Sequence, residues 1–352
     1  MDLPVMPPVS PMLAKAVSGL ESLAASDGGY LFEPKWDGFR AVVFRDGDEV
    51  EIGGRNKTLT RYFPELVRAL RENLPDRVVV DGEVVVRVGE PGAQRLDWET
   101  LSQRIHPAAT RVERLSQETP ASFIAFDLLA AGGDALLEEP FSTRRARLEE
   151  ALAAAAAPVH LTRVTDDPVR ATRWFSSFEG AGLDGLVAKP RRATYQPGKR
   201  VMLKLKHSRT ADAVVLGYRV HTSGQGVGSL LLGLHTADGQ LVGVGGASAF
   251  TVARRLELVD ELDPYVVRDA DGTPVRGDKD RNRFSALKDT TFLQLRPELV
   301  VEVRYDQMEG QRFRHAVQLL RFRPDRDPAS CTYDQLDRPV AYDLDDVLTG
   351  AS

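Results

Sequence analysis

The residues best able to do chemistry lie in one short segment near the N-terminus, EPKWDGFR, which spans residues 33–40. Lys35 stands between an extended stretch and an Asp-Gly turn, and a lysine held there can be the nucleophile of a nucleotidyl transfer. Because an amine attacks only when neutral, this hypothesis requires other cations near Lys35. Glu33, two residues earlier, should face the same way. A pattern this short also occurs as a solvated lysine before a turn, so the rest of the chain must support it.

Three further segments carry residues that could join such a site. The turn GGRN presents Arg55, whose planar guanidinium can hold a phosphate. The apolar run VVVDGEVVV contains Glu83 just past a glycine, and a carboxylate in so apolar a segment is costly unless it has a partner or a function. In FIAFDLL, Phe126 is expected to be core packing unless its surroundings make it a platform for a stacked base.

Two basic clusters contrast with the formal net charge of −5. If residues 202–206, MLKLK, form a strand, Lys204 and Lys206 share one face and repel each other unless an anion such as a phosphate lies between them. Each cluster alone is typical of a solvated surface, but together they favour a partner rich in phosphate. The first cluster holds Lys189, Arg191, Arg192, Lys199, Arg200, Lys204, Lys206 and Arg209, and the second holds Arg312, Arg314, His315, Arg321, Arg323 and Arg326.

The elements that must position these residues are expected to form two domains in a chain of 352 residues. In residues 1–207, strands succeed one another without regular helical crossovers, which is typical of an α+β domain built on antiparallel sheet. In residues 208–352, short strands alternate with polar or glycine-rich turns, a pattern that predicts a small β-barrel of the oligonucleotide-binding kind. The strands are expected at 30–35, 40–45, 77–86, 122–129, 213–220, 229–235, 240–244 and 299–305, and helices at 60–73, 142–153 and 252–262.

The cysteine content and the distribution of apolar residues indicate the cellular compartment. The single cysteine, Cys331, excludes an internal disulfide and a cysteine-rich metal site. The N-terminal residues do not have the pattern of a signal peptide, and no apolar stretch is long enough to cross a membrane. We therefore expect a cytoplasmic monomer that does not bind membranes.

Taken in order, these segments resemble the motifs of the covalent nucleotidyltransferases, and within them the ATP-dependent DNA ligases. EPKWDGFR is similar to the first motif, and GGRN, VVVDGEVVV, FIAFDLL, LDGLVAKP, MLKLK and RFRPDRDP are similar to those that follow. Each motif is short, so the specificity comes from their joint order. In length and wording the chain resembles the compact bacterial type found in actinobacterial end-joining and repair systems. The resemblance implies an adenylation domain over residues 1–207 and an oligonucleotide-binding barrel over 208–352.

The resemblance also implies a role for each candidate residue. Lys35 would be the nucleophile that carries AMP, Glu33 would accept the adenine amino group, and Phe126 would stack on the adenine. The other implied contacts are Arg40 and Glu83 to the ribose, Arg55 to a phosphate, Asp184 and Glu83 to a divalent metal, Lys189, Lys204 and Lys206 to the α-phosphate, and Arg323, Asp325 and Arg326 to the triphosphate. The chain departs from the family pattern at Asp184, where glutamate is usual, at Met202, where an aromatic residue is usual, and at Arg326, where lysine is usual.

The function implied by the resemblance is ATP-dependent sealing of 5′-phosphate and 3′-hydroxyl ends in DNA repair, through lysyl-AMP and adenylated DNA, with Mg²⁺ or Mn²⁺ as metal. The expected partners are nicked or broken duplex DNA and repair proteins in trans. The barrel is expected to swing about a hinge at 207–210 between steps. Two alternatives stay open: a capping-type guanylyltransferase or RNA ligase, which share the lysine motif, and a non-catalytic DNA-binding module that has kept the fold.

Overall fold

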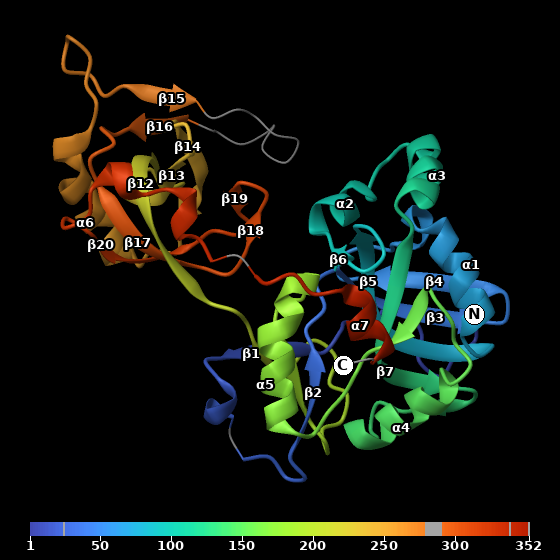
Figure 1. Cartoon of the computed structure of the whole chain (residues 1–352). Coiled ribbons are helices and arrows are strands. Elements are labelled where there is room, and N and C mark those ends of the chain that lie inside the picture. Colours follow the sequence, from blue (N-terminus) through green and yellow to red (C-terminus); the bar gives the residue numbers. More distant parts are fainter. Residues whose placement is uncertain (24, 279–290, 338, 351–352) are drawn as a thin grey trace. The chain divides into compact units, whose positions relative to one another are not determined.

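The computed structural model describes residues 1–23, 25–278, 291–337 and 339–350, and the chain divides into two compact units (Figure 1). Met1–Lys206 and Pro339–Ser352 form the first unit, and His207–Arg338 form the second. The sequence prediction assigned residues 339–352 to the second domain. They belong to the first because Leu344 and Val347 are fully buried in its core.

The first unit is built on two sheets whose strands are mainly antiparallel. The larger sheet has the order β4-β3-β5-β7-β8, with β6 on β5 and β9 on β7, and the smaller has the order β1-β11-β10-β2. The larger sheet comprises β3 Phe39–Asp46, β4 Glu49–Gly54, β5 Arg77–Val88, β6 Arg95–Leu96, β7 Ala121–Ala131, β8 Asp134–Ala135 and β9 Val159–Leu161. The smaller comprises β1 Leu13–Val17, β2 Tyr30–Pro34, β10 Leu186–Pro190 and β11 Arg200–Leu205.

Alternating side chains give the larger sheet two apolar faces. On one face, Val43 and Val80 pack with Leu66 and Leu70, which are four residues apart on one side of α1. On the other face, Phe44 and neighbouring strand residues pack with residues of the N-terminal segment and of β11. The helices of this unit are α1 Pro64–Asn73, α2 Trp98–Gln103, α3 Ala109–Glu118, α4 Phe141–Ala151, α5 Pro168–Ser177 and α7 Leu344–Thr349.

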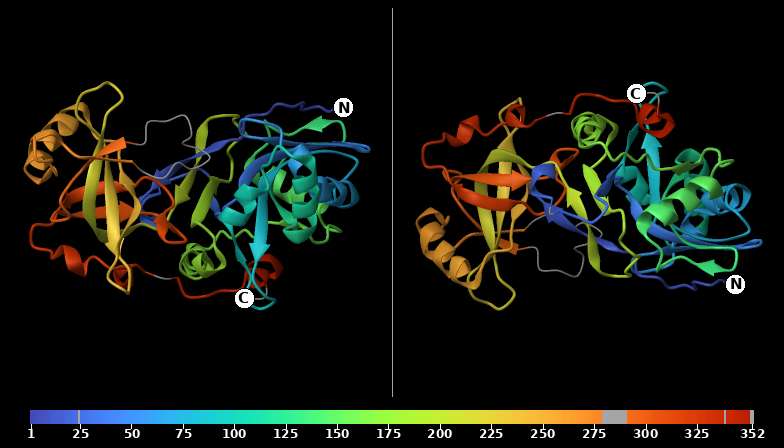
Figure 2. Two further views of the ribbon diagram at one scale, coloured as in Figure 1. Left: turned by 90° about the horizontal axis from the view of Figure 1, so that it is seen from above. Right: turned by 90° about the horizontal axis from the view of Figure 1, so that it is seen from below.

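The second unit is an antiparallel barrel organised by one long strand, β12. This strand pairs with β13, β16 and β17, and β17 pairs in turn with β20. A bridge between Ala247 at the end of β14 and Val317 just before β20 closes the ring of strands. Helix α6 packs beside β13 (Figure 2). The main elements are β12 Arg209–Val220, β13 Val227–His235, β14 Leu241–Ala247, α6 Val252–Leu262, β15 Arg276–Asp278, β16 Thr291–Gln294, β17 Val300–Tyr305, β18 Met308–Glu309, β19 Arg312–Phe313 and β20 Gln318–Phe322. The prediction of an α+β domain followed by a small barrel is confirmed.

Among the described residues, no helix has the length and apolar character needed to cross a bilayer.

The docking of the C-terminal segment can be tested through the stability of the first unit. The side chain of Leu344 is fully buried, so Leu344→Ala should lower the free energy of unfolding by roughly 2–4 kcal/mol through lost burial and a residual cavity. The three tryptophans, Trp36, Trp98 and Trp174, all belong to the first unit, so urea unfolding followed by their fluorescence reports on it. Val340→Ala, at a side chain that is 87% exposed, is the control. Equal effects of the two changes would contradict this docking.

Candidate active site

A cavity of about 460 Å³ in the first unit gathers most of the predicted site residues. Strands from both sheets and the segment around Met12 line it, so the residues that meet there are far apart in the sequence. The predicted residues that line the cavity are Glu33, Lys35, Arg40, Arg55, Glu83, Phe126, Lys189 and Lys204. Asp184 and Lys206 join them through ion pairs, whereas Arg323, Asp325 and Arg326 belong to the second unit.

Lys35 is fixed by its backbone and by its amine. Its N–H donates to the carbonyl of Gly185 at 2.8 Å, and its carbonyl accepts from the N–H of Asp184 at 2.9 Å. The Lys35 Nζ lies 2.6 Å from Asp184 Oδ2, which also contacts Lys206 Nζ at 2.8 Å. Burial alone would raise the pKa of Asp184, but the two ammonium groups hold it below its ordinary value. The carboxylate predicted to bind a metal therefore lies between two lysines.

Lys206, next to the end of the basic strand, pairs with a protein carboxylate. The strand β11 ends at Leu205, and Lys206 Nζ lies 2.8 Å from Asp184 Oδ2; a phosphate between Lys204 and Lys206 stays a prediction. Burial lowers the pKa of Lys204, and the nearby charges of Lys206 and Lys35 lower it further. Lys204 and Lys206 are thus two further cations near Lys35, and Asp184 offsets part of their charge.

Glu33 and Lys189 form a buried pair at another part of the cavity. Their Oε2 and Nζ atoms are 2.8 Å apart, and Lys189 also donates to the carbonyl of Phe126 at 2.9 Å. Burial raises the pKa of Glu33 and lowers that of Lys189, so it opposes the charge of both. Among the described residues, Glu33 Oε1 has no hydrogen-bond partner although it is buried. It is an acceptor available to a donor group such as an exocyclic amine. Lys189 was expected near the α-phosphate, but its contacts are with Glu33 and the main chain of β7.

Arg40 is held by a fully buried carboxylate that the sequence analysis did not assign to the site. Its Nε and one terminal nitrogen donate to the two oxygens of Asp81 at 2.6 and 2.7 Å, and Tyr195 Oη donates to Asp81 at 2.6 Å. The guanidinium lies over the ring of Phe126, 4.2 Å from its centroid. A base stacked on that face would displace it. Asp81 stands out in the sequence as an acid in an apolar strand, whereas nothing in the local sequence marked Tyr195.

Glu83 is the carboxyl of this cavity that titrates near neutrality. It lies directly opposite Arg40 in the pairing of β5 with β3. Burial raises its pKa to about 7, even though Arg40 and Lys35 act in the opposite direction. Within the described part of the chain, no three His, Cys, Asp or Glu side chains are grouped as metal ligands. Glu83 is a cavity carboxylate that could hold a divalent ion, which would take its other ligands from nucleotide phosphates and water.

Arg55 is an exposed residue at the cavity wall. It follows Gly54, whose N–H donates to the carbonyl of Lys57 at 3.0 Å and so closes a tight turn. A Cβ on Gly54 would lie 2.7 Å from that same carbonyl oxygen, so the turn needs glycine there. The guanidinium of Arg55 is thus available to a phosphate that enters from solvent.

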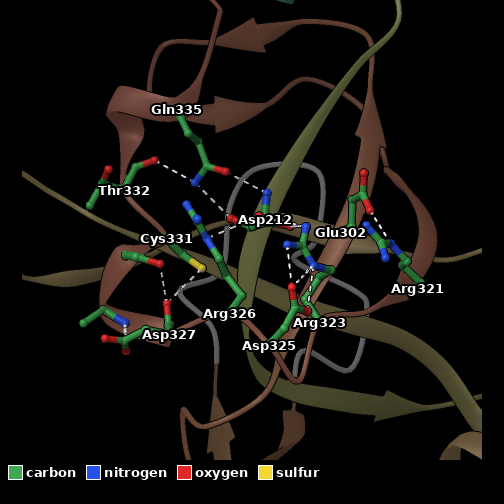
Figure 3. A network of polar contacts seen from close by, with 12 residues as sticks. Asp212, Glu302, Arg321, Arg323, Asp325, Arg326, Asp327, Cys331, Thr332 and Gln335 are labelled. Atoms are coloured by element: carbon green, nitrogen blue, oxygen red, sulfur yellow. Dashed lines mark hydrogen bonds and ion pairs between the residues drawn. The ribbon is translucent and has the colours of Figure 1, made fainter.

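The second basic cluster is divided between two environments within the second unit. Arg321, Arg323 and Arg326 pair with Glu302, Asp325 and Asp212 (Figure 3). The other members lie at a separate cavity of about 350 Å³, whose basic and hydroxyl side chains are Arg219, Ser229, Ser248, Arg312, Arg314 and His315.

Comparisons with known proteins agree with these features. A model of the ATP dependent DNA ligase domain matches residues 11–206, and a model of the ATP dependent DNA ligase C terminal region matches residues 223–326. DNA ligase C of Mycobacterium tuberculosis and DNA ligase C1 of Mycolicibacterium smegmatis are each 54% identical to the chain, and each match covers 99% of both proteins. A solved structure of a Lig E DNA ligase has a TM-score of 0.55 at 18% identity and covers 89% of this chain and 99% of its own, which shows a shared fold.

The raised pKa of Glu83 predicts a pH-dependent stability. With a folded pKa of about 7 against an ordinary 4.5, the folded state favours the protonated carboxyl, so stability is lost as the pH rises through this window. Glu83→Gln cannot ionise. It should resemble the parent near pH 5 and exceed it by roughly 1–3 kcal/mol above about pH 8, as measured by urea unfolding. Glu72→Gln, on the exposed side of α1, is the control. A Glu83→Gln variant no more stable than the parent at high pH would contradict the assignment.

Proposed function

The chain belongs to the ATP-dependent DNA ligases, and from this premise we propose that its first unit binds ATP in the 460 Å³ cavity and transfers AMP to Lys35. The observation that carries the proposal is that Lys35 shares this cavity with Glu33, whose Oε1 is buried, has no hydrogen-bond partner among the described residues and lies 4.0 Å from Arg145 Nη1. One group can attack a phosphate while the other accepts a hydrogen bond from the adenine amine. Membership of this family sets aside the capping-type guanylyltransferase, the RNA ligase and the non-catalytic module.

In the first step, the neutral amine of Lys35 attacks the α-phosphorus of ATP, a nitrogen–phosphorus bond forms and pyrophosphate leaves. The ammonium of Lys35, whose side chain is 20% exposed, must first lose its proton to solvent and leave its contact with Asp184. Lys204 and Lys206 would then offset the charge that builds up on the α-phosphate. AMP passes next to the 5′-phosphate of a nick, and attack by the 3′-hydroxyl on that phosphorus joins the strand and releases AMP.

The base and sugar are proposed to contact the other side of the cavity. Glu33 accepts from the adenine amine, and Phe126 stacks on the base once Arg40 has left the face of its ring. Arg40 and Glu83 bind the ribose. Mg²⁺ or Mn²⁺, held through Glu83 and phosphate oxygens, would supply charge neutralisation at the triphosphate. Arg55 would hold a phosphate at the cavity wall.

The second unit is proposed to serve two purposes. Arg323, Asp325 and Arg326 close over the triphosphate in the first step, with the two arginines making the phosphate contacts. The basic cavity around Arg312 and Arg314 contacts phosphates of duplex DNA in the later steps. Serving both requires the barrel to move about the connection near residue 207. We also propose a cytoplasmic monomer in DNA repair, which acts at nicks or breaks with repair proteins in trans. The lone buried Cys331 suits a reducing compartment.

The nucleophile assignment predicts a specific loss of function. After incubation with labelled ATP, the wild type should retain an acid-labile label and seal a nicked duplex, because phosphoramidates hydrolyse in acid. Lys35→Ala should retain no label and seal no unmodified nick, yet still bind the nicked duplex. Lys15→Ala, an exposed lysine of β1, is the control and should keep both activities. Labelling of the Lys35→Ala protein at the wild-type level would show that another residue is the nucleophile.

A further inference from the structure

In the second unit, the carboxylate of Asp212 contacts both Arg323 and Arg326 of the segment RFRPDRDP (Figure 3). A terminal nitrogen of Arg323 lies 3.2 and 3.3 Å from the two oxygens of Asp212, and Arg326 Nε lies 3.4 Å from Oδ2. Because both guanidinium groups are positively charged, they repel each other, and the shared carboxylate offsets that repulsion.

The backbone around Asp212 is fixed on several sides. Its N–H donates to Gln335 Oε1 at 2.7 Å, and its carbonyl accepts from Gln335 Nε2 at 3.0 Å. On the neighbouring strand, Glu302 lies directly opposite Asp212 in the β12–β17 pairing. The N–H of Arg323 donates to the carbonyl of Val300 on that strand at 2.8 Å, which fixes the backbone of Arg323. The carboxylate and the arginines are therefore attached to the same sheet.

Arg323 contacts two carboxylates, an inner one that is nearly buried and an outer one that is exposed. The Asp212 side chain is 13% exposed, whereas that of Asp325 is 65% exposed. Asp325 accepts from the Nε and the second terminal nitrogen of Arg323, both at 2.9 Å, and this hydrogen bonding lowers the pKa of Asp325 to about 2. An arriving phosphate oxygen can replace the exposed Asp325 carboxylate at this edge while the inner contact with Asp212 remains.

We propose that Asp212 is a positioning residue for AMP transfer to Lys35: it holds Arg323 and Arg326 at a fixed spacing, ready for the triphosphate of ATP. The inference rests on the proposed function of these two arginines. A guanidinium that is already oriented loses little freedom when the phosphates bind, so the contribution falls on the step that uses a triphosphate. Sealing of DNA that already carries AMP involves no triphosphate and should not need Asp212.

The experiment compares two single-turnover rates, AMP transfer from ATP to the protein and sealing of a pre-adenylated nick. Asp212→Ala should slow AMP transfer by about tenfold or more and change sealing by less than about twofold. The isosteric Asp212→Asn, which keeps an acceptor oxygen but no charge, should give an intermediate loss. Glu302→Gln is the matched control, because it removes the carboxylate that pairs with Arg321 at 2.6 Å on the adjacent strands. It should leave AMP transfer unchanged.

A double-mutant cycle sharpens the result. If Asp212 acts through Arg323, Asp212→Ala should add little to the loss caused by Arg323→Ala alone. Unchanged AMP transfer in both Asp212 variants, or an equal fall of both rates in the isosteric Asp212→Asn, would overturn the inference. If Arg323→Ala itself transfers AMP normally, the proposed contact of Arg323 with the triphosphate fails. If Arg323→Ala slows AMP transfer but both Asp212 variants transfer AMP at the wild-type rate, the role of Asp212 is wrong and the role of the arginines stands.

Discussion

The pairing of buried opposite charges is the interaction on which the cavity of the first unit depends. Glu33 with Lys189, Arg40 with Asp81, and Lys35 with Asp184 each join residues from different segments, and the last pair is 149 residues apart. A buried charge without its partner costs several kcal/mol, so these side chains are tolerable only after the strands have paired. The site therefore exists only in the folded protein, and loss of one partner leaves the other charge uncompensated.

The apolar strands around these pairs give the charges their chemical character. Because β5 and β7 are buried on both faces, the carboxyl of Glu83 is partly desolvated and its pKa rises to about 7. Glu33 on β2 is also buried, and its Oε1 has no hydrogen-bond partner among the described residues, an arrangement that a ligand can complete. In the second unit the charged side chains are less buried: Asp212 is nearly buried and Asp325 is exposed. The buried Glu33 Oε1 suits an amino group of a nucleobase, and the exposed Asp325 carboxylate can be exchanged for a phosphate.

Sequence reasoning succeeded where the signal was local. Continuous apolar or β-branched runs located β5 and β7, and the strand expected after the Asp-Gly turn is β3. Glu33 and Lys35, two residues apart, both line one cavity. It failed where the answer depends on partners distant in sequence. Asp81 and Asp212 acquire roles through strand register, and Tyr195 does so through its hydrogen bond to Asp81. Asp184 meets Lys35 because two backbone hydrogen bonds join their segments. The helices α2, α3, α5 and α7 were not predicted. Of these, α2 and α7 have only six residues each, and helices of that length are stabilised by packing more than by propensity.

The central claim is that Lys35 is the nucleophile in a cavity that holds two further lysines. The most direct measurement is peptide mapping by tandem mass spectrometry of the wild-type protein after incubation with ATP and Mg²⁺, with the site of modification read from the fragments. The account predicts AMP on the peptide that contains Lys35, lost after mild acid. AMP on Lys204 or Lys206 in place of Lys35, or no covalent AMP in a protein that still seals nicks with ATP, would contradict it.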